Sequence, residues 1–269
     1  MITAASESGD DGALKTTIGL AKKTNPDSTS EIDALAADLA KAAAEKHVAQ
    51  LESNTFFEGW SGEGRAGGSL NTGNTDARDF SVGLRLQKEG LRWNHLVLAD
   101  ADYARQNDVA SQNRASSSYQ GNLKLGDRWY GLAFAGWERD RFAGFDRRFS
   151  EAIGVGYTAY RTQDVSLGFE AGPAYRQTHF IDGEQEHRVG LRFATNYAWT
   201  IVPDVQFTEN AVYYAQSGNS TFTSNTALTA KVRGALSVQA SFFYNREQRP
   251  PLGLNRVDTT TRLSLVYGF

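Results

Sequence analysis

The sequence contains no cysteine, only five prolines and no long apolar run. The absence of cysteine excludes a disulfide framework, a thiolate metal site and a cysteine nucleophile. A membrane-spanning helix needs about 20 consecutive apolar residues, and the longest apolar runs are short stretches such as residues 96–99. A helical membrane protein is therefore excluded. The net charge of −3, with no basic tract, indicates no nucleic-acid partner.

The start of the chain also lacks the apolar core of a signal peptide, so we expect a mature or re-engineered form. Residues 1–56 have the pattern of a helical segment. Apolar residues recur at helical spacing over 31–53, after a capping Ser28 or Ser30, and a shorter helix over 11–23 is stopped at Pro26. We expect this segment to be periplasmic.

The longer predicted helix has a narrow apolar stripe, which needs a partner to be buried. Two interpretations stay open: a solvated linker, or an element for self-association or for binding another protein. The stripe consists of Ile32, Leu35, Leu39, Val48 and Leu51.

From Trp60 onward every second residue tends to be apolar, a spacing that is typical of β-strands and replaces the helical spacing. We assign residues 57–269 to a transmembrane β-barrel. Phe80, Val82 and Leu84, for example, alternate with polar or small residues. The facing of the run 128–139 stays open. The predicted strands are 60–72, 77–88, 91–105, 113–126, 128–139, 147–160, 164–178, 185–199, 203–216, 220–233, 235–247 and 256–269.

A soluble β-sandwich would also alternate, so strand length decides between the two folds. Most of the runs have 12–16 residues, against about 5–6 in soluble sheets. An even number of strands is the rule in single-chain bacterial barrels. Aromatic residues also gather near predicted strand ends, as at membrane interfaces: Trp60, Trp93, Trp129, Trp137, Tyr160, Trp199, Tyr213 and Tyr214. We therefore predict an all-β, up-and-down membrane barrel of about twelve antiparallel strands in a bacterial outer membrane, in contact with its lipid.

Turn lengths predict the orientation of the barrel. The turns at 89–90, 126–127, 162–163, 201–202 and 234 are tight, whereas 73–76, 106–112, 140–146, 179–184 and 248–255 are longer. Short turns are periplasmic and long loops extracellular in such barrels. Both termini should therefore be periplasmic.

The last strand alternates and finishes on a C-terminal phenylalanine. It resembles the recognition strand by which the barrel-assembly machinery selects its clients, and this machinery is the partner expected during biogenesis. The residues that carry the signal are Leu263, Leu265, Tyr267 and Phe269.

Two further motifs point to a family. Residues 67–76, Gly-Gly-Ser-Leu-Asn-Thr-Gly-Asn-Thr-Asp, and residues 137–145, Trp-Glu-Arg-Asp-Arg-Phe-Ala-Gly-Phe, followed by Gly-Val-Gly-Tyr at 154–157, resemble the salt-induced outer membrane protein family. This family is the domain of unknown function four hundred and eighty-one. The resemblance covers about 60–269 and implies an outer-membrane barrel with a loose link to osmotic stress. It implies no activity.

No catalytic or metal-binding constellation is visible, and no cofactor is expected. His47, His95, His179 and His187 lie in different elements, and Glu184, Glu186 and His187 fit a hydrated hairpin end better than a metal site. His95 is the one histidine that could belong to the active site of a lipid-modifying barrel enzyme, but the sequence places no serine where it would clearly pair with it. We therefore predict that the protein is not an enzyme.

Alternation predicts which charged side chains point into the barrel and line its lumen. Six positive and three negative charges give a surplus of three positive charges. The predicted pore-lining residues are Arg85, Asp100, Asp102, Lys124, Glu170, Arg176, Arg192, Lys231 and Arg262.

Twelve strands lie between the eight of a filled barrel and the sixteen of an open pore. The leading hypothesis is a small channel, non-specific or weakly anion-preferring. The alternative is a non-conducting structural or assembly component with a salt-bridged interior. A second basic group, Arg139, Arg141, Arg147 and Arg148, frames a predicted extracellular hairpin that either binds anionic headgroups or pairs with Asp140 and Asp146.

Overall fold

A computed structural model describes residues 1–7, 11–71, 77–106 and 109–269. It divides into a helical unit, Met1–Gly59, and a β unit, Trp60–Phe269. Among the described helices, none combines the length and the apolarity that crossing a membrane would require.

The helical unit contains α1 (Ile2–Glu7), α2 (Asp11–Thr24), the short 3-10 helix η1 (Pro26–Ser28) and α3 (Thr29–Ser53). The sequence predicted α2 and α3 and missed α1, which is too short to show a helical period. α2 ends at Thr24, just before the predicted stop at Pro26. Ser28 is the N-cap residue of α3, and its side chain makes no capping hydrogen bond. An ion pair between Lys22 and Asp33 joins α2 to α3.

The apolar stripe of α3 is unevenly covered. Ile32 is buried within the helical unit, whereas Leu35 and Val48 are 41% and 44% exposed. Leu39 and Leu51 are partly buried. The exposed part of the stripe is the part that remains available to a partner.

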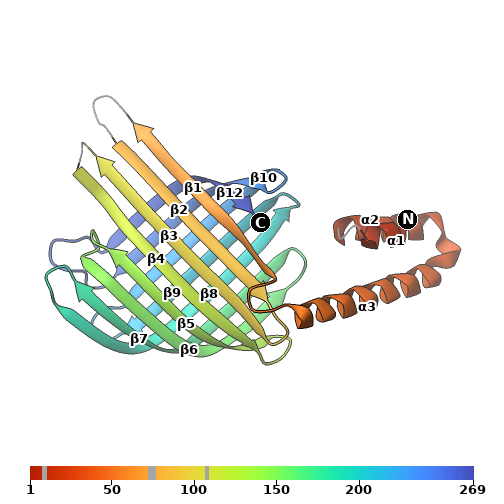
Figure 1. Cartoon of the computed structure of the whole chain (residues 1–269), viewed down its shortest axis with the longest axis horizontal. Helices are drawn as coiled ribbons and strands as arrows, with labels where there is room; N and C mark the ends of the chain where they lie inside the picture. The colour runs from red at the N-terminus through yellow and green to blue at the C-terminus, as the bar shows by residue number, and fades with distance from the viewer. Residues whose placement is uncertain (8–10, 72–76, 107–108) are drawn as a thin grey trace. The chain divides into compact units, whose positions relative to one another are not determined.

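The β unit is a closed antiparallel barrel of twelve strands, each paired with its neighbours in sequence (Figure 1). This confirms the predicted fold class, with most strand bounds within two residues of those expected. The strands are β1 (Trp60–Asn71), β2 (Ala77–Glu89), β3 (Trp93–Gln106), β4 (Val109–Lys124), β5 (Trp129–Asp140), β6 (Phe145–Arg161), β7 (Val165–Phe180), β8 (Gln185–Val202), β9 (Val205–Gln216), β10 (Thr221–Arg233), β11 (Leu236–Glu247) and β12 (Val257–Gly268).

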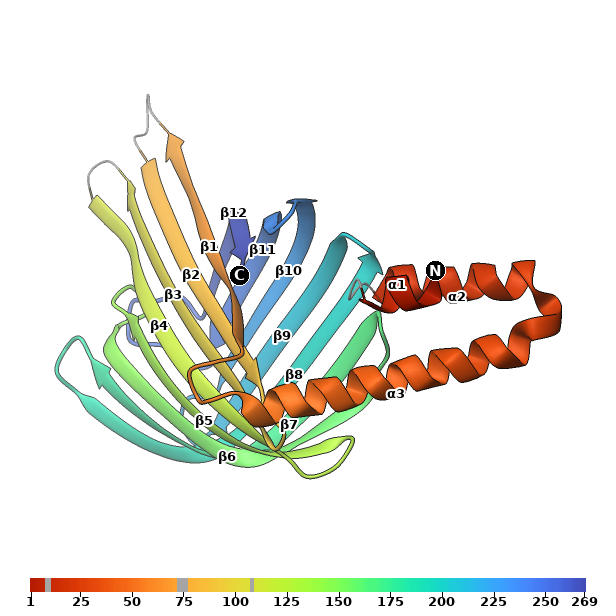
Figure 2. The same cartoon turned by 45° about the vertical axis from the view of Figure 1, so that its right-hand side comes forward.

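Strands β1 and β12 close the ring antiparallel to each other (Figure 2). The seam ends with a reciprocal backbone pair: Gly62 N donates to Phe269 O at 2.8 Å, and Phe269 N donates to Gly62 O at 2.9 Å. Because every strand has two neighbours, the barrel has no unpaired edge, which a β-structure in lipid requires.

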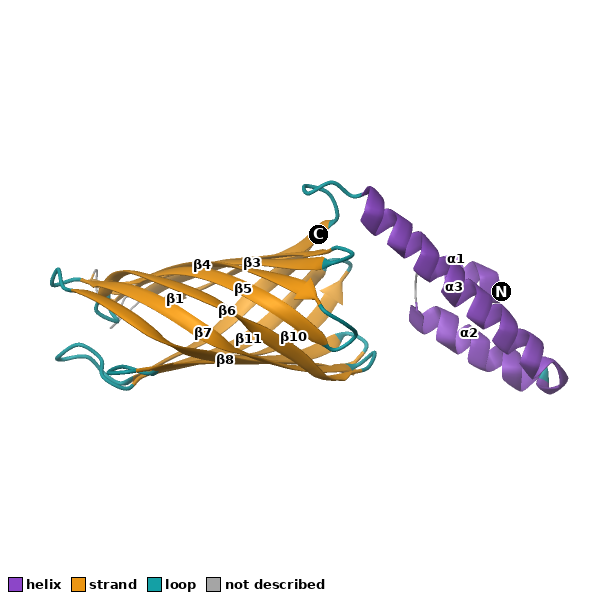
Figure 3. Ribbon diagram, turned by 90° about the horizontal axis from the view of Figure 1, so that it is seen from below, coloured by secondary structure: helices purple, strands orange, loops and turns teal. Residues whose placement is uncertain are grey.

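Two ends of the barrel can be distinguished by their connections (Figure 3). The "turn end" holds Trp60, Phe269 and the connections 90–92, 125–128, 162–164, 203–204 and 234–235. The "loop end" holds the connections 141–144, 181–184, 217–220 and 248–256.

Two predicted connections were wrong. The predicted loop 106–112 is largely strand, because β3 continues to Gln106 and β4 begins at Val109, and the predicted turn 201–202 moves to 203–204. Polar residues such as Gln112 carry no period that separates strand from loop. The predicted loop 73–76 lies outside the described residues.

Exposed apolar side chains cover much of the outer face of the barrel, as on a lipid-facing surface. Ile153 on β6, Val189 on β8 and Leu263 on β12 are 66%, 75% and 72% exposed. Aromatic residues lie at the strand ends of the turn end, namely Trp60, Trp93, Trp129, Tyr160 and Trp199. Tyr214 differs from the expected girdle, because its side chain is buried inside the barrel beneath Arg176.

Candidate channel interior

Contacts between strands that are not neighbours identify the inner face, because only side chains inside a closed barrel can reach across it. Arg148 on β6 contacts Glu247 on β11, and these strands lie five places apart around the ring of twelve. Gln120 on β4 contacts Glu170 on β7, and Asp102 on β3 contacts Arg262 on β12. Alternation from these residues fixes the facing of each strand, including β5, whose Tyr130, Phe134 and Glu138 point inward.

Near the loop end, side chains cross the full width of the barrel. The Arg148 Nη2 to Glu247 Oε1 distance is 2.8 Å, and both side chains are buried. The Arg114 guanidinium of β4 lies 4.1 Å from the centroid of the Phe243 ring on β11. Glu138 lies between the two arginines, 3.5 Å from Arg114 and 3.9 Å from Arg148. We call Arg114, Glu138, Arg148 and Glu247 the crossing network.

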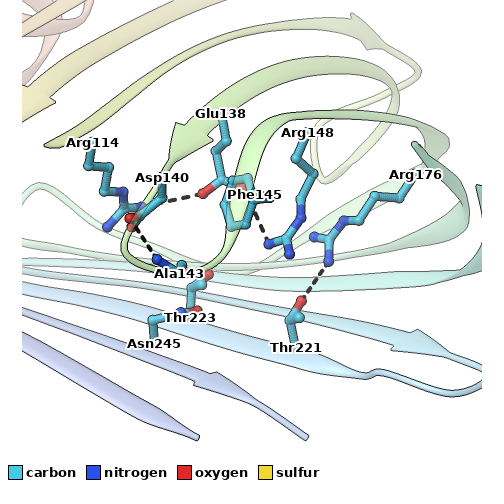
Figure 4. Close-up of a pocket in the computed structure, with 10 residues that line it drawn as sticks. All are labelled: Arg114, Glu138, Asp140, Ala143, Phe145, Arg148, Arg176, Thr221, Thr223 and Asn245. Carbon is cyan, nitrogen blue, oxygen red and sulfur yellow. Dashed lines mark hydrogen bonds and ion pairs between the residues drawn. The ribbon is translucent and has the colours of Figure 1, made fainter. Parts of the chain in front are cut away.

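A cavity of about 20 Å³ lies within this network, with Phe145, Arg176 and Thr221 in its wall (Figure 4). This volume holds about one water molecule. The loop-end half of the interior is therefore a constriction in this structure.

Closer to the turn end, the charges stay on one wall. Glu170 on β7 accepts hydrogen bonds from Gln120 (2.8 Å), Tyr130 (3.0 Å) and Asn196 (3.4 Å). Its second oxygen pairs with Arg192 Nη1 at 2.8 Å. The Glu170 cluster thus satisfies a buried carboxylate fully, which offsets the cost of removing it from water.

Beside this cluster the interior is open to solvent. Asn196 on β8 and Asn210 on β9 face each other in register on the inner face, and both are exposed. A side chain can be both interior and exposed only where solvent enters the barrel. The lumen therefore has space at this level.

A third group lines the wall formed by β1, β3 and β12. Arg65 pairs with Asp100, and the Arg262 Nη2 to Asp102 Oδ2 distance is 2.6 Å. Like Arg192 with Glu170, these arginines are paired with carboxylates of the same wall.

All nine predicted lumen residues have the inward register, and seven of them lie within these groups or beside them: Arg85, Asp100, Asp102, Glu170, Arg176, Arg192 and Arg262. Lys124 and Lys231 lie at the turn-end rim, where Lys124 Nζ contacts Glu89 and the Gly90 carbonyl and Lys231 is exposed. Whether these side chains line a conducting path stays a prediction.

Arg85 and Arg176 on the inner face have no carboxylate oxygen within 4 Å among the described residues, although Glu63 lies opposite Arg85 in the register of β1 and β2. Arg176 instead donates to Ser150 (3.2 Å) and Thr221 (2.9 Å) and lies 3.8 Å above the Tyr214 ring. Their positive charge is the part of the predicted surplus that no ion pair offsets.

Sequence reasoning missed the whole crossing network. Arg148 was grouped with the surface arginines of the hairpin, but its side chain is 7% exposed and points into the barrel. Arg148 faces inward because it alternates regularly with Ser150, which contacts the inner Arg176, and Arg147 faces outward. Of the other hairpin groups, Arg139 lies 3.6 Å from Asp146, and Asp140 accepts hydrogen bonds from Phe142 N and Ala143 N.

No cluster of metal ligands occurs in the part of the chain that the structure describes. His95 faces outward with its Nδ1 2.8 Å from the Tyr119 hydroxyl, and His187 Nδ1 lies 2.6 Å from the Tyr175 hydroxyl. His179 Nε2 lies 3.0 Å from Gln177 Nε2. None of these contacts is a serine–histidine pair.

Solved structures with similar folds are outer-membrane barrels. The NanC porin is 13% identical, with a TM-score of 0.47, over 77% of this chain and 98% of that one. The KdgM porin in complex with disordered oligogalacturonate is 13% identical, with a TM-score of 0.44, over 78% and 99%. An outer membrane channel from Pseudomonas putida F1 is 9% identical, with a TM-score of 0.45, over 78% and 95%. At these identities the likeness concerns the fold alone.

No curated protein sequence matches the chain. The family model "Protein of unknown function, DUF481" matches residues 64–269, which is nearly the whole barrel. The match agrees with the two motifs at 67–76 and 137–145. The chain belongs to the DUF481 family.

Proposed function

We propose that the barrel is a narrow channel for small solutes in the bacterial outer membrane. The observation that carries this proposal is the solvent-exposed interior at Asn196 and Asn210. A barrel that served only as a packed scaffold would fill this level with side chains, as eight-stranded barrels do. Charged and hydroxyl-bearing walls above and below suit the passage of hydrated solutes.

The channel prefers anions weakly. Arg85 and Arg176 place positive charge on the inner face without a carboxylate oxygen within 4 Å, and low-dielectric walls focus such a field on the lumen. Basic side chains around a pore favour anion passage. The other interior arginines contribute less, because carboxylates pair with them.

The turn end faces the periplasm in this proposal, which puts the helical unit and both termini there. The nine-residue connection 248–256 at the loop end supports this orientation, since long loops of such barrels are extracellular. A role in osmotic stress rests on the family resemblance alone. A small-solute channel would suit that role.

Liposome swelling tests the channel. Purified barrel in vesicles should admit small sugars and amino acids and exclude larger oligosaccharides, because the lumen is narrow. Empty vesicles and vesicles with heat-unfolded protein are the controls. Folded, inserted protein that admits no solute of any size, with the constriction intact or removed, would contradict the proposal.

A non-conducting structural or assembly component is the second candidate. The crossing network supports it, because Arg148–Glu247 and Arg114–Phe243 both span the lumen. The exposed Leu35 and Val48 of α3 would then bind a partner protein or a second copy of the chain. A lipid-modifying enzyme has the least support, since His95 contacts a tyrosine hydroxyl.

A further inference from the structure

The loop end of the barrel is covered by two connections from opposite sides. The β5–β6 hairpin turn, residues 141–144, lies against the β11–β12 loop, residues 248–256. A Cβ atom added to Gly144 would lie 2.7 Å from Pro251 Cγ and 2.9 Å from Leu254 Cδ1, so the two connections are in close contact. β5 and β12 are five places apart around the ring, and this contact therefore spans the mouth.

The two connections are held differently. The β11–β12 loop is tied to the neighbouring β9–β10 connection, where Gln248 N donates to Ser220 O at 3.0 Å and Arg249 N donates to Asn219 Oδ1 at 2.8 Å. The hairpin turn is stiffened internally by Asp140, and one backbone hydrogen bond, from Ile181 N to Gly144 O, joins it to the β7–β8 connection. Its contact with Pro251 and Leu254 is apolar. The hairpin turn is therefore the part that can move as a unit.

The Arg148–Glu247 pair lies directly beneath the cover. Glu247 lines a cavity of about 130 Å³ together with Phe142, Ala143 and Leu254, and Asn219 Nδ2 donates to its second oxygen at 3.1 Å. Arg148 also stacks at 3.9 Å on Phe145, which begins β6 directly after the hairpin turn. One ion pair thus joins the base of the hairpin to the opposite wall.

We propose that residues 141–144 form a gate over the channel and that the Arg148–Glu247 pair is its latch. This inference rests on the proposed channel function and names how the channel is regulated. In the closed state the hairpin turn contacts the β11–β12 loop and the latch divides the lumen. In the open state Arg148 leaves Glu247 and the hairpin turn moves off Pro251 and Leu254, with the cavity beneath providing room. The gate interconverts between two discrete arrangements, as bistable packed elements do.

Single-channel recording in planar bilayers tests the latch. Glu247→Gln and the double variant R148Q/E247Q should raise the open fraction by about tenfold or more, because the closed state loses its cross-lumen ion pair. The double variant removes Arg148 together with Glu247, so no buried charge loses its partner, and it should fold even where the single variant does not. Glu186→Gln is the matched control, because Glu186 pairs with Arg188 two residues along the same strand and its pair crosses nothing. Unchanged open fractions in folded latch variants would overturn the latch.

A reversible lock tests the gate itself. The chain has no cysteine, so Ala143→Cys with Leu254→Cys, two positions that line one cavity, provides the sole thiols. Oxidation should join them and reduce the current by about tenfold, and dithiothreitol should restore it. A disulfide that forms without changing the current, or thiols that never join, would overturn the gate while leaving the channel intact. If neither R148Q/E247Q nor a variant with residues 141–144 replaced by Asn-Gly conducts, the channel function itself fails.

Discussion

The two halves of the barrel interior pair their buried charges differently: within one wall near the turn end, and across the lumen near the loop end. Near the turn end, Glu170 on β7 is hydrogen-bonded and paired with residues of β4, β5 and β8, all on one wall, and solvent reaches Asn196 and Asn210 beside it. Near the loop end, Arg148 finds its carboxylate on the far side of the barrel. A charge pair within a wall leaves the lumen open, and a pair across the lumen closes it.

This difference predicts that the Glu170 cluster serves stability and the Arg148–Glu247 pair serves control. Glu170→Ala should destabilise the folded barrel by about 3–5 kcal/mol, because it leaves Arg192 buried without its carboxylate. Urea unfolding in detergent micelles measures this loss. The conductance of the protein that still folds should be close to that of the wild type.

Glu170→Gln is the control, since it keeps an acceptor for Tyr130 and Gln120 and should lose less stability than alanine. If Glu170→Ala raised the open fraction as strongly as R148Q/E247Q, the division between the two halves would be wrong.

The ion selectivity of variants distinguishes paired from unpaired interior arginines. Arg176→Gln should weaken chloride preference more than Arg85→Gln does, because Arg176 lies at the constriction and contacts no carboxylate. Arg192→Gln and Lys231→Gln should have smaller effects, since Arg192 is paired and Lys231 lies at an exposed rim. Reversal potentials in a potassium chloride gradient measure the preference. It should fade toward 1 M salt, where the Debye length is about 3 Å.

An equal shift of the reversal potential for all four variants would indicate that overall lumen charge, rather than unpaired charge, sets the preference.

Deletion of Phe269 should reduce the yield of inserted barrel. The residue carries the predicted assembly signal, and its backbone also makes two hydrogen bonds to Gly62 at the seam. Phe269→Leu keeps both hydrogen bonds and separates the two roles. The fraction of protein that migrates differently on gels without boiling measures folding. A normal yield after deletion would remove Phe269 from both roles.

Removal of residues 1–56 should have the smallest effect on the barrel, because the β unit is compact by itself. If the exposed part of the α3 stripe mediates association, the assembled mass should fall by more than the deleted segment accounts for. Leu35→Ser with Val48→Ser should reproduce that change in the full chain, as measured by light scattering. An unchanged assembly in both variants would make the helices a linker.

The fold could be predicted from the sequence because lipid and lumen impose opposite demands on alternate residues. Alternating runs such as Phe80–Val82–Leu84 therefore reveal the strands. The same alternation correctly predicted that Glu170, Arg176 and Arg192 lie on the inner face. Alternation predicts whether a side chain points inward or outward. It does not predict where along the barrel axis the side chain lies or which residue it contacts across the lumen. Arg148 and Glu247, 99 residues apart, therefore carried no visible sign of pairing.

The remaining errors are local. Arg148 was grouped with the hairpin arginines, although it belongs to the regularly alternating part of β6 and therefore faces the interior together with Ser150. Tyr213 and Tyr214 are adjacent, so one of them had to face inward, and the Arg176 guanidinium selects Tyr214 by stacking on its ring.

Single-channel recording of the full chain in a planar bilayer tests the central claim most directly. We expect discrete openings of small conductance, separated by long closures, with a reversal potential shifted toward that of chloride. R148Q/E247Q should shorten the closures without changing the sign of that shift. A folded, inserted protein that carries no current, with and without the Arg148–Glu247 pair, would contradict the account.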